Sequence, residues 1–240
     1  MITIWAVASS LEIWPPYLFP SPREVFHSFT QGFADLTFVF AVLATLRRLL
    51  IGYAVSLVTG IFLGMFIARS KLLEETLGSL ILGLQTLPSI CWLPLALLWF
   101  GLNESAIIFV VIMGALLSIT LATQSGIRSA PPLLVRAGRN MGAKGVRMLF
   151  EVVIPAAMPS IIGGMRQGWS FAWRSLMAGE LLYGSVGLGN LLNMGRELND
   201  MSQVLAVMLI IVVIGLLADY FVFSKIEKEI LKRWGLLTSS

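Results

Sequence analysis

The sequence predicts an all-α protein, a polytopic bundle of about six transmembrane helices. Hydrophobic residues make up 57% of the 240 residues, charged residues make up only 12%, and the mean hydropathy is +0.87. A soluble domain carries about 25% charged residues, so the polar surface that water requires is missing. A chain of this length favours one membrane domain over residues 1–240 rather than two domains.

The N-terminal part predicts a short span and an interfacial helix. Residues 1–14 are apolar without the basic start of a cleaved signal, so we expect a first span. A spanning helix needs about 17–25 residues, so this one either leans on its neighbours or begins further upstream. The proline-rich PPYLFPSPREV at 15–25 predicts an extended loop. Residues 24–48 are apolar with interspersed charges, which is typical of a helix at the membrane interface.

Five longer apolar segments predict the remaining spans. Residues 49–68 carry Gly60 and Gly64, a pair of small residues that lets another helix approach closely. Residues 78–100 contain Pro88 and Pro94, which predict kinks in that span. The other spans are expected at 105–127, 159–182 and 203–224.

Basic residues indicate how the chain is oriented. Cytoplasmic loops carry an excess of Lys and Arg, and most of the 17 basic residues fall within 69–77, 128–158 and 225–240. This pattern predicts a multi-pass membrane protein with both termini in the cytoplasm. Arg47 and Arg48 run against the pattern, and we expect them to reach the headgroups on the outer side.

The residue types present exclude most enzyme classes. The chain has one histidine, His27, and one cysteine, Cys91, so it offers no metal-ligand cluster, catalytic triad or disulfide framework. It contains no G-x-x-x-x-G-K-[ST] phosphate loop. The GSVGLG at 184–189 follows a membrane helix rather than a strand, which predicts a turn and not a dinucleotide site. A net charge of +4 is too small to indicate nucleic acid binding. We therefore expect no catalytic residue, metal or cofactor in this chain.

The segment VRAGRNMGAKGVRMLFEVVIPAAMP at 135–159 differs from the spans on either side. Gly138, Gly142 and Gly145 predict short helical pieces rather than one long helix, and Pro155 is expected to end the second piece. A basic loop resting on anionic headgroups explains the charges. It leaves the glycines and apolar residues unexplained, and these favour a short helix pair that projects from the membrane and docks on another protein.

This segment resembles the cytoplasmic coupling loop of the permeases of binding-protein-dependent ABC importers. The family pattern is Glu-Ala-Ala, three residues, Gly, nine residues, and Ile-x-Leu-Pro, and the spacing fits throughout. Arg136 replaces the family's Glu, which reverses a charge at the contact, and Gly138 replaces its second Ala. The resemblance implies that the loop docks in a groove of a cytoplasmic ATPase through Arg136, Ala137, Gly138, Gly142, Ala143, Ile154 and Pro155.

Further segments extend the resemblance over nearly the whole chain. LFPSPREV (18–25), LQTLPSICWLPLALLWFGLNESA (84–106) and SVGLGNLL (185–192) are similar to the branch that imports nitrate, sulfonate, taurine and bicarbonate. GMRQGWSFAWRSLMAGELL (164–182) and GRELNDMSQV (195–204) are most similar to its alkanesulfonate and nitrate permeases.

The resemblance implies the type I importer permease fold and a set of partners in a prokaryotic cell membrane. A separate ATPase dimer uses ATP and Mg, and a second copy of the permease completes the path, because one six-span chain encloses no pore. A binding protein outside the membrane delivers the small anion. Membrane lipid surrounds the spans, and nucleic acid has no part. Transport proceeds by alternating access.

Ionisable residues inside the spans are candidates for function, because such groups are costly in lipid and usually face a cavity or a partner. Arg166 and Asp219 lie at equal depth, roughly 10 Å from the inner surface at about 1.5 Å of rise per residue. An ion pair between them is favoured over a substrate role.

Arg174 lies near the middle of its span, with no acidic residue at matching depth in that span. Its planar guanidinium suits the oxygens of sulfonate or nitrate, which predicts an anion path lined by Arg174, Trp173, Ser170 and Glu180. Two alternatives stay open for Arg174: an ion pair with Glu180, or a contact with a helix C-terminus of the second copy. Trp173 alternatively serves packing.

Other transport classes are also considered. An ion-coupled secondary transporter needs carboxylates near the midplane and usually a repeated half, and neither is visible in the sequence. A purely structural membrane subunit would need neither the spaced loop nor Arg174. A permease of the same ABC family for an unrelated small solute stays open, because the sequence does not name the anion.

Overall fold

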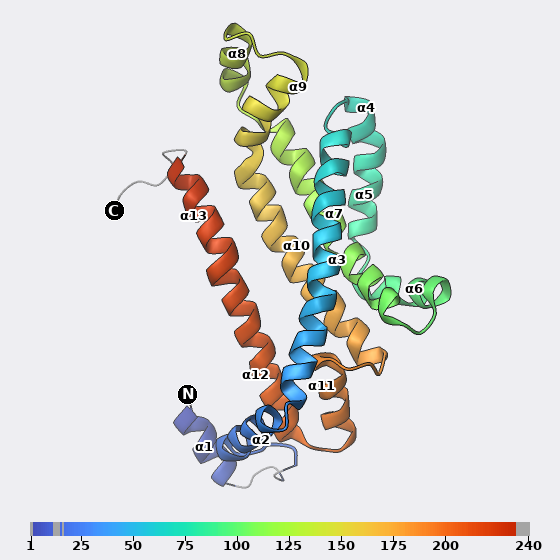
Figure 1. The fold of residues 1–240 in the computed structure, drawn as a ribbon, viewed down its shortest axis with the longest axis vertical. Coiled ribbons are helices and arrows are strands. Elements are labelled where there is room, and N and C mark those ends of the chain that lie inside the picture. Colours follow the sequence, from blue (N-terminus) through green and yellow to red (C-terminus); the bar gives the residue numbers. More distant parts are fainter. Residues whose placement is uncertain (1, 12–14, 16, 234–240) are drawn as a thin grey trace.

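The computed structural model describes residues 2–11, 15 and 17–233, and every regular element among them is helical (Figure 1). The α-helices are α1 (Ile2–Ser10), α2 (Pro22–Ala34), α3 (Thr37–Ile67), α4 (Lys71–Leu73), α5 (Ser79–Gln85), α6 (Leu93–Phe100), α7 (Glu104–Arg128), α8 (Pro132–Asn140), α9 (Gly145–Met148), α10 (Ile154–Leu182), α11 (Leu188–Glu197), α12 (Met201–Ala218) and α13 (Ser224–Arg233). Wider π-helical turns join α4 to α5 (Glu74–Gly78), α9 to α10 (Leu149–Val153) and α12 to α13 (Asp219–Phe223), and a 3-10 turn (Ser89–Trp92) precedes α6.

Among the described residues, four helical stretches are long and apolar enough to cross a membrane: Thr37–Ile67, Glu104–Arg128, Gly145–Leu182 and Met201–Glu229. The segments Lys71–Gln85 and Ser89–Phe100 add a fifth if they count as one broken span, since they meet at a bend of 100°. Pro88 stands at the bend with extended backbone (φ −53°, ψ 134°). It cannot continue α5 because it lacks an N–H group. The kink predicted at this proline is therefore a sharp elbow.

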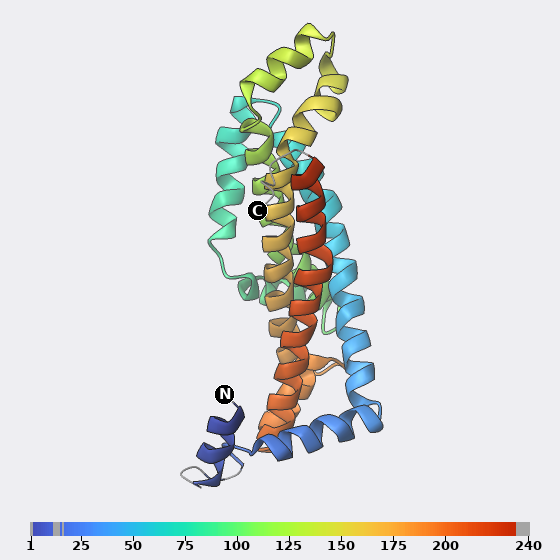
Figure 2. The ribbon, with the colours of Figure 1, turned by 90° about the vertical axis from the view of Figure 1, so that its left-hand side faces the viewer.

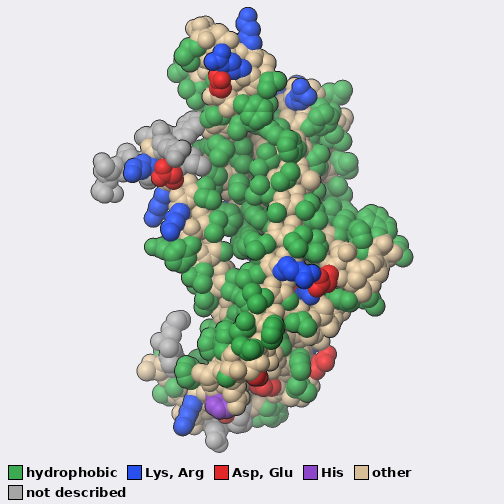
Figure 3. Space-filling model, viewed as in Figure 1, with side chains coloured by type: hydrophobic (Ala, Val, Ile, Leu, Met, Phe, Trp, Pro, Cys, Tyr) green, Lys and Arg blue, Asp and Glu red, His purple; other side chains and the backbone are tan. Residues whose placement is uncertain are grey.

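The crossings alternate in direction through one elongated bundle. In Figure 1, α3 leads from α2 toward α4, α7 leads to α8, α10 returns to α11, and α12 and α13 lead back again. The pair α8 and α9 therefore lies at one end of the bundle, and α1, α2 and α11 lie at the other (Figures 1 and 2). Hydrophobic side chains cover most of the face between these ends in Figure 3, as expected of a surface in contact with lipid.

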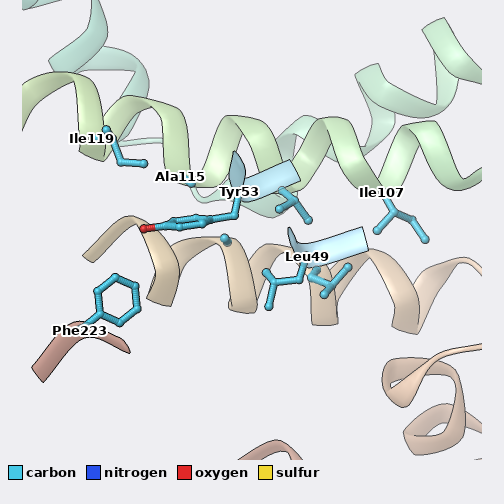
Figure 4. Packing of buried hydrophobic residues seen from close by; sticks show 9 residues of the cluster. Leu49, Tyr53, Ile107, Ala115, Ile119 and Phe223 are labelled. Atoms are coloured by element: carbon cyan, nitrogen blue, oxygen red, sulfur yellow. The ribbon is translucent and has the colours of Figure 1, made fainter. Parts of the chain in front are cut away.

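Helix α7 packs along both α3 and α10, and the main core fills the space between them. Gly60 and Gly64 of α3 lie against α7, where an added Cβ would lie 3.0 Å from Cβ of Ile119 and 2.6 Å from the carbonyl oxygen of Thr120. The predicted close approach at this glycine pair is thus confirmed. The buried core residues (Figure 4) are Leu49, Tyr53, Ile107, Val111, Ala115, Ile119, Ala172, Leu176 and Phe223.

The N-terminal segment differs from the expectation of a first span over residues 1–14. Helix α1 has nine residues, and residues 12–14 lie outside the described part of the chain. At about 1.5 Å per residue, such a helix covers less than half of the roughly 30 Å hydrocarbon core. The structure also places α1 at the end opposite α8 and α9, whereas α13 extends toward α8 and α9 (Figure 1). The cytoplasmic location of both termini stays a prediction, since residues 1 and 234–240 lie outside the described part of the chain.

The expected interfacial helix over 24–48 is divided in two. A capping box at Ser21 and Glu24 starts α2, which lies across the end of the bundle (Figure 2). Leu36 adopts a left-handed backbone (φ 64°), which separates α2 from α3. The transmembrane helix begins at Thr37 rather than at residue 49, and Arg48 is buried within it.

Candidate functional site

Helices α8 and α9 form a short helix pair that projects from one end of the bundle (Figure 1). Gly142 (φ 88°) and Gly145 (φ 54°) make the turn between them, and both conformations favour glycine because they are left-handed. The backbone N–H of Ala143 donates to the carbonyl of Gly138 at 2.9 Å. Gly138 packs closely on the π-helical turn, where an added Cβ would lie 2.9 Å from Cγ2 of Val152.

The surface of this helix pair is both basic and apolar. Arg136 and Ala137 are exposed on α8, and Arg136 makes no ion pair with any described residue. Exposed apolar side chains gathered on a projecting element are typical of a protein contact. The four most exposed ones are Leu133 (76%), Met141 (79%), Val146 (70%) and Phe150 (58%).

Ile154 and Pro155 are placed differently from the prediction. They form the first turn of α10, and the π-helical turn Leu149–Val153 runs into that helix without a break. Pro155 therefore does not end a helical piece. Pro159 lies inside α10 instead of starting it.

The structure brings Arg166 and Asp219 together, as the sequence predicts. Nε of Arg166 donates to Oδ1 of Asp219 at 2.6 Å, and Nη2 donates to Oδ2 at 2.7 Å. Glu227 of α13 adds a second acidic partner, 3.4 Å from Nη1. The two side chains of the pair are 46% and 40% exposed, so the pair lies at the surface of the chain rather than in its core.

Glu180 does not line a path with Arg174, and it does not pair with Arg174. It is fully buried, and its carboxylate accepts hydrogen bonds from Nη1 of Arg48 at 2.8 Å, from Oγ1 of Thr45 at 2.9 Å and from the backbone N–H of Gly189 at 3.0 Å. The expectation that Glu180 faces the path is therefore wrong for this chain, because its charge is already compensated inside the protein.

Arg48 extends this network to two further elements. Its guanidinium donates to Glu104 at the start of α7 (2.8 Å) and to the carbonyl of Val186 (2.7 Å) in the turn after α10. Arg48 is buried instead of reaching the headgroups as predicted. The network was missed because its members are far apart in sequence. The glycine-rich turn at 184–189 was the one local sequence signal for this network. Glycine is required at position 187 because an added Cβ there would lie 2.5 Å from the carboxylate of Glu180.

Arg174 lines a cavity of about 290 Å³ beside the elbow between α5 and α6. Its side chain is exposed and forms no ion pair with any described residue. Its guanidinium lies 5.9 Å from the ring centre of Phe171. The cavity, called the elbow cavity below, is lined by Gln85, Thr86, Leu87, Pro88, Ser89, Trp92, Met113, Gly114, Leu117, Phe171 and Arg174.

Other predicted path residues divide between two faces of α10. Ser170, one turn from Arg174, is exposed on the same face, as is Gln167. Trp173 is half-buried against the main core and stacks on Trp169, with 6.4 Å between ring centres. Trp173 therefore packs the bundle, and an exposed polar stripe formed by Gln167, Ser170 and Arg174 remains.

The sequence predicted the kink at Pro88 but not the part that the polar residues beside it play in the cavity. Gln85, Thr86 and Ser89 lie more than 80 residues from Arg174 in sequence, and packing of the broken span against α7 and α10 brings them to the same cavity. The described residues contain no group of three possible metal ligands. The site offers one cation, amide and hydroxyl groups and an apolar wall, which suit binding rather than bond-breaking chemistry.

Comparisons with known proteins agree with this architecture. Residues 60–224 match the family model described as "Binding-protein-dependent transport system inner membrane component". Three relatives are a putative ABC transporter permease of Methanocaldococcus jannaschii (32% identical, 95% of this chain and 90% of that protein), a putative aliphatic sulfonates transport permease of Escherichia coli (30%, 98% and 89%) and a riboflavin transport system permease of Chloroflexus aurantiacus (30%, 98% and 87%). A chain of the inward-facing MetNI methionine ABC transporter superposes with a TM-score of 0.72 at 19% identity, covering 81% of this chain and 96% of that chain.

Proposed function

The chain belongs to the family of binding-protein-dependent transport system inner membrane components, and from this premise we propose that it conducts a small anion through an ATP-driven importer. It is a multi-pass membrane permease with the fold of ABC importer subunits. The anion is of the alkanesulfonate, nitrate, taurine or bicarbonate class. The observation that carries the anion assignment is Arg174, an exposed arginine that no described acidic residue neutralises, on a helix that crosses the membrane.

The charge of Arg174 favours anions for an electrostatic reason. An ion that leaves water for the membrane interior loses hydration, and a fixed opposite charge lowers the resulting barrier. Gln167 and Ser170 continue the polar face of α10 toward the end that carries α8 and α9. Polar residues on a spanning helix normally face a water-filled space or another chain. This stripe is therefore proposed as part of the translocation path.

A second copy of the chain closes the path. The polar stripe and the elbow cavity are exposed in the single chain, and lipid would leave their polar groups unpaired. A twofold arrangement that places these faces opposite each other encloses them. We assign the two copies to a homodimer surrounded by membrane lipid.

The projecting pair α8 and α9 is the proposed contact for a separate ATPase dimer, which uses ATP and Mg. Its exposed Met141, Val146 and Phe150 support this role. This contact defines the cytoplasmic end of the bundle, so α1, α2 and α11 face outward, where a substrate-binding protein docks. ATP-driven closure of the ATPases then moves the helix pair, and the bundle opens to the outside.

Transport by the reconstituted complex tests this proposal. Permease, ATPase and binding protein are placed in liposomes, and ATP-dependent uptake of labelled taurine or nitrate is measured with the other anions as competitors. We expect saturable uptake that stops without ATP. Uptake of a neutral solute with no competition by any of these anions would contradict the anion assignment.

A permease of the same family for an unrelated small solute is the second candidate, supported by the similarity to the riboflavin transport system permease. The two candidates differ in the expected role of Arg174, because an uncharged solute gains little from a fixed cation. An ion-coupled secondary transporter has no such support, since Glu180 and Asp219 are both engaged by arginines.

A further inference from the structure

The elbow cavity differs from the rest of the exposed stripe because three segments distant in sequence build it, from residues 85–92, 113–117 and 171–174. The 100° bend between α5 and the 3-10 turn carries Gln85, Thr86 and Ser89 to the cavity that Arg174 of α10 lines. Gln85, Thr86 and Ser89 flank Pro88 at this bend, so the bend sets their position relative to Arg174. The bend therefore forms part of the cavity wall in addition to breaking the span.

We propose that the elbow cavity is a binding subsite of the permease itself for a small organic oxyanion, one with a sulfonate-type head and a short apolar tail. The inference rests on the proposed function and adds to it a specific site and a chemical class. It means that the membrane subunit selects its substrate in addition to passing what the binding protein delivers.

The polar side of the cavity carries donors without partners. Arg174 has no ion pair, and the side chains of Gln85 and Ser89 make no hydrogen bond to any described residue. The hydroxyl of Thr86 already donates to the carbonyl of Gly83 at 2.7 Å. Arg174, Gln85 and Ser89 thus supply a guanidinium, an amide and a hydroxyl, all of which donate to oxyanion oxygens. No acidic residue lines the cavity, so a cation would find no counter-charge there.

The apolar side of the cavity favours an organic anion over an inorganic one. Leu87, Trp92, Met113, Leu117 and Phe171 form this wall. Nitrate and bicarbonate have no apolar part to place against it, whereas the alkyl chain of a sulfonate would leave water there, a gain of about 0.8 kcal/mol per buried CH₂ group.

The size of the cavity suits a small ligand. Its volume of about 290 Å³ in the single chain is close to the lower end of the roughly 300–1,000 Å³ that ligand sites occupy. A short alkanesulfonate fits this space.

Thiol protection tests the subsite directly. Cys91 is the chain's one cysteine, so a Cys91→Ser background carrying Thr86→Cys presents a single thiol at the cavity without removing one of the three donors. The full complex of permease and ATPase in lipid nanodiscs is treated with an anionic (sulfonatoethyl) or a cationic (trimethylammonioethyl) methanethiosulfonate reagent. The modification rates are then measured with ethanesulfonate, with its uncharged analogue ethyl methyl sulfone, or with nitrate. Thr30→Cys on α2, in the same Cys91→Ser background, is the matched control because this position is exposed on a helix at the end of the bundle, away from the elbow.

We expect the anionic reagent to react faster than the cationic one at the elbow. Adding Arg174→Gln should reduce this preference by about three- to tenfold, the range for one unit charge in a partly hydrated environment. Ethanesulfonate should slow modification several-fold, nitrate less so, and the sulfone not at all. None of these additions should alter the rate at the control thiol.

Several outcomes would overturn the subsite. If the sulfone protects as well as ethanesulfonate does, the site does not recognise a negative charge. If nitrate protects as well as ethanesulfonate does, the site does not prefer organic anions. If the anionic reagent still reacts faster than the cationic one after Arg174→Gln, Arg174 does not attract anions to the cavity. If ethanesulfonate gives no protection while the complex still imports sulfonates with ATP, the subsite is wrong and the proposed function stands. If protection occurs but no anion is imported, the proposed function fails and the binding site stands.

Discussion

Arg48 of α3 and Glu180 of α10 form an ion pair in the interior of the chain, 132 residues apart in sequence, with 2.8 Å between Nη1 and Oε1. The two side chains are 2% and 0% exposed. Thr45 and the backbone of Gly189 complete the shell of the carboxylate. Because Arg48 also contacts Glu104, this pair ties α3, α7 and α10 together at the end of the bundle opposite α8 and α9.

The buried pair should dominate the stability of that end. Glu180→Gln leaves the buried Arg48 with Glu104, which is 41% exposed, as its remaining acidic partner, and we expect a loss of about 3 kcal/mol in the free energy of unfolding. Asp219→Asn is the matched control, because it breaks an ion pair whose side chains are 40–46% exposed. Its expected cost is about 1 kcal/mol or less, since Arg166 keeps Glu227 as a partner.

Thermal unfolding in detergent checks this ranking. The melting temperature should fall clearly more for Glu180→Gln than for Asp219→Asn. Equal shifts would mean that the two pairs contribute alike and that burial of the Arg48–Glu180 pair has no energetic consequence.

Gly64 is predicted to be intolerant of even one methyl group. The Cβ of Gly64→Ala would lie 2.6 Å from the carbonyl oxygen of Thr120, so α3 and α7 must separate, at a cost of about 1–3 kcal/mol. Gly83→Ala is the control, because no atom lies within 4 Å of its added Cβ. Alanine is also the better helix former by about 1 kcal/mol. The stability of the two variants should therefore change in opposite directions, and a stable Gly64→Ala protein would contradict the close packing of these helices.

Gly142 should affect docking through its backbone. Its φ of 88° is left-handed and its added Cβ meets open space, so Gly142→Ala causes strain of about 1–2 kcal/mol rather than a collision within this chain. The turn between α8 and α9 would shift, and we expect normal membrane insertion with less ATPase recovered by co-purification. Gly163→Ala, which also meets open space but lies within α10, should leave co-purification unchanged. Normal ATPase recovery with Gly142→Ala would remove the role of this turn in docking.

Arg174 is predicted to matter for transport and not for assembly. Arg174→Gln should keep its fold and bind the ATPase, because the arginine has no ion pair to lose. Uptake of the anion should fall by about tenfold or more, since a mid-membrane cation no longer offsets the dehydrated charge. Arg174→Lys should restore part of the activity, because it retains the charge but not the planar two-point contact.

Uptake into proteoliposomes and binding-protein docking are measured in parallel for these variants. Arg196→Gln on α11 is the control, an exposed arginine at the outer end whose guanidinium contacts only Asn193 in the described chain. Full uptake by Arg174→Gln would mean that the charge of Arg174 is not needed for transport.

The sequence by itself determined the fold class, most of the spans and the projecting loop with its glycines. Hydrophobic composition and the length of apolar runs are local properties, so they predict transmembrane helices without knowledge of the partners. The pairing of Arg166 with Asp219 was also within reach, because depth in a membrane follows from position along a helix of known rise. For the first span predicted over residues 1–14, the structure describes the nine-residue helix α1, and residues 12–14 lie outside the described part.

Only the tertiary structure decided which charged groups are paired inside the chain and which have no ion pair with another described residue. Glu180 and Arg174 lie six residues apart on one helix, yet one is fully buried against Arg48 and Thr45 while the other faces an open cavity. That difference depends on which helix covers each face of α10, and on a bend at Pro88 that brings Gln85 and Ser89 to Arg174. Contacts between residues so far apart in sequence arise from packing, and no local pattern of residues contains them.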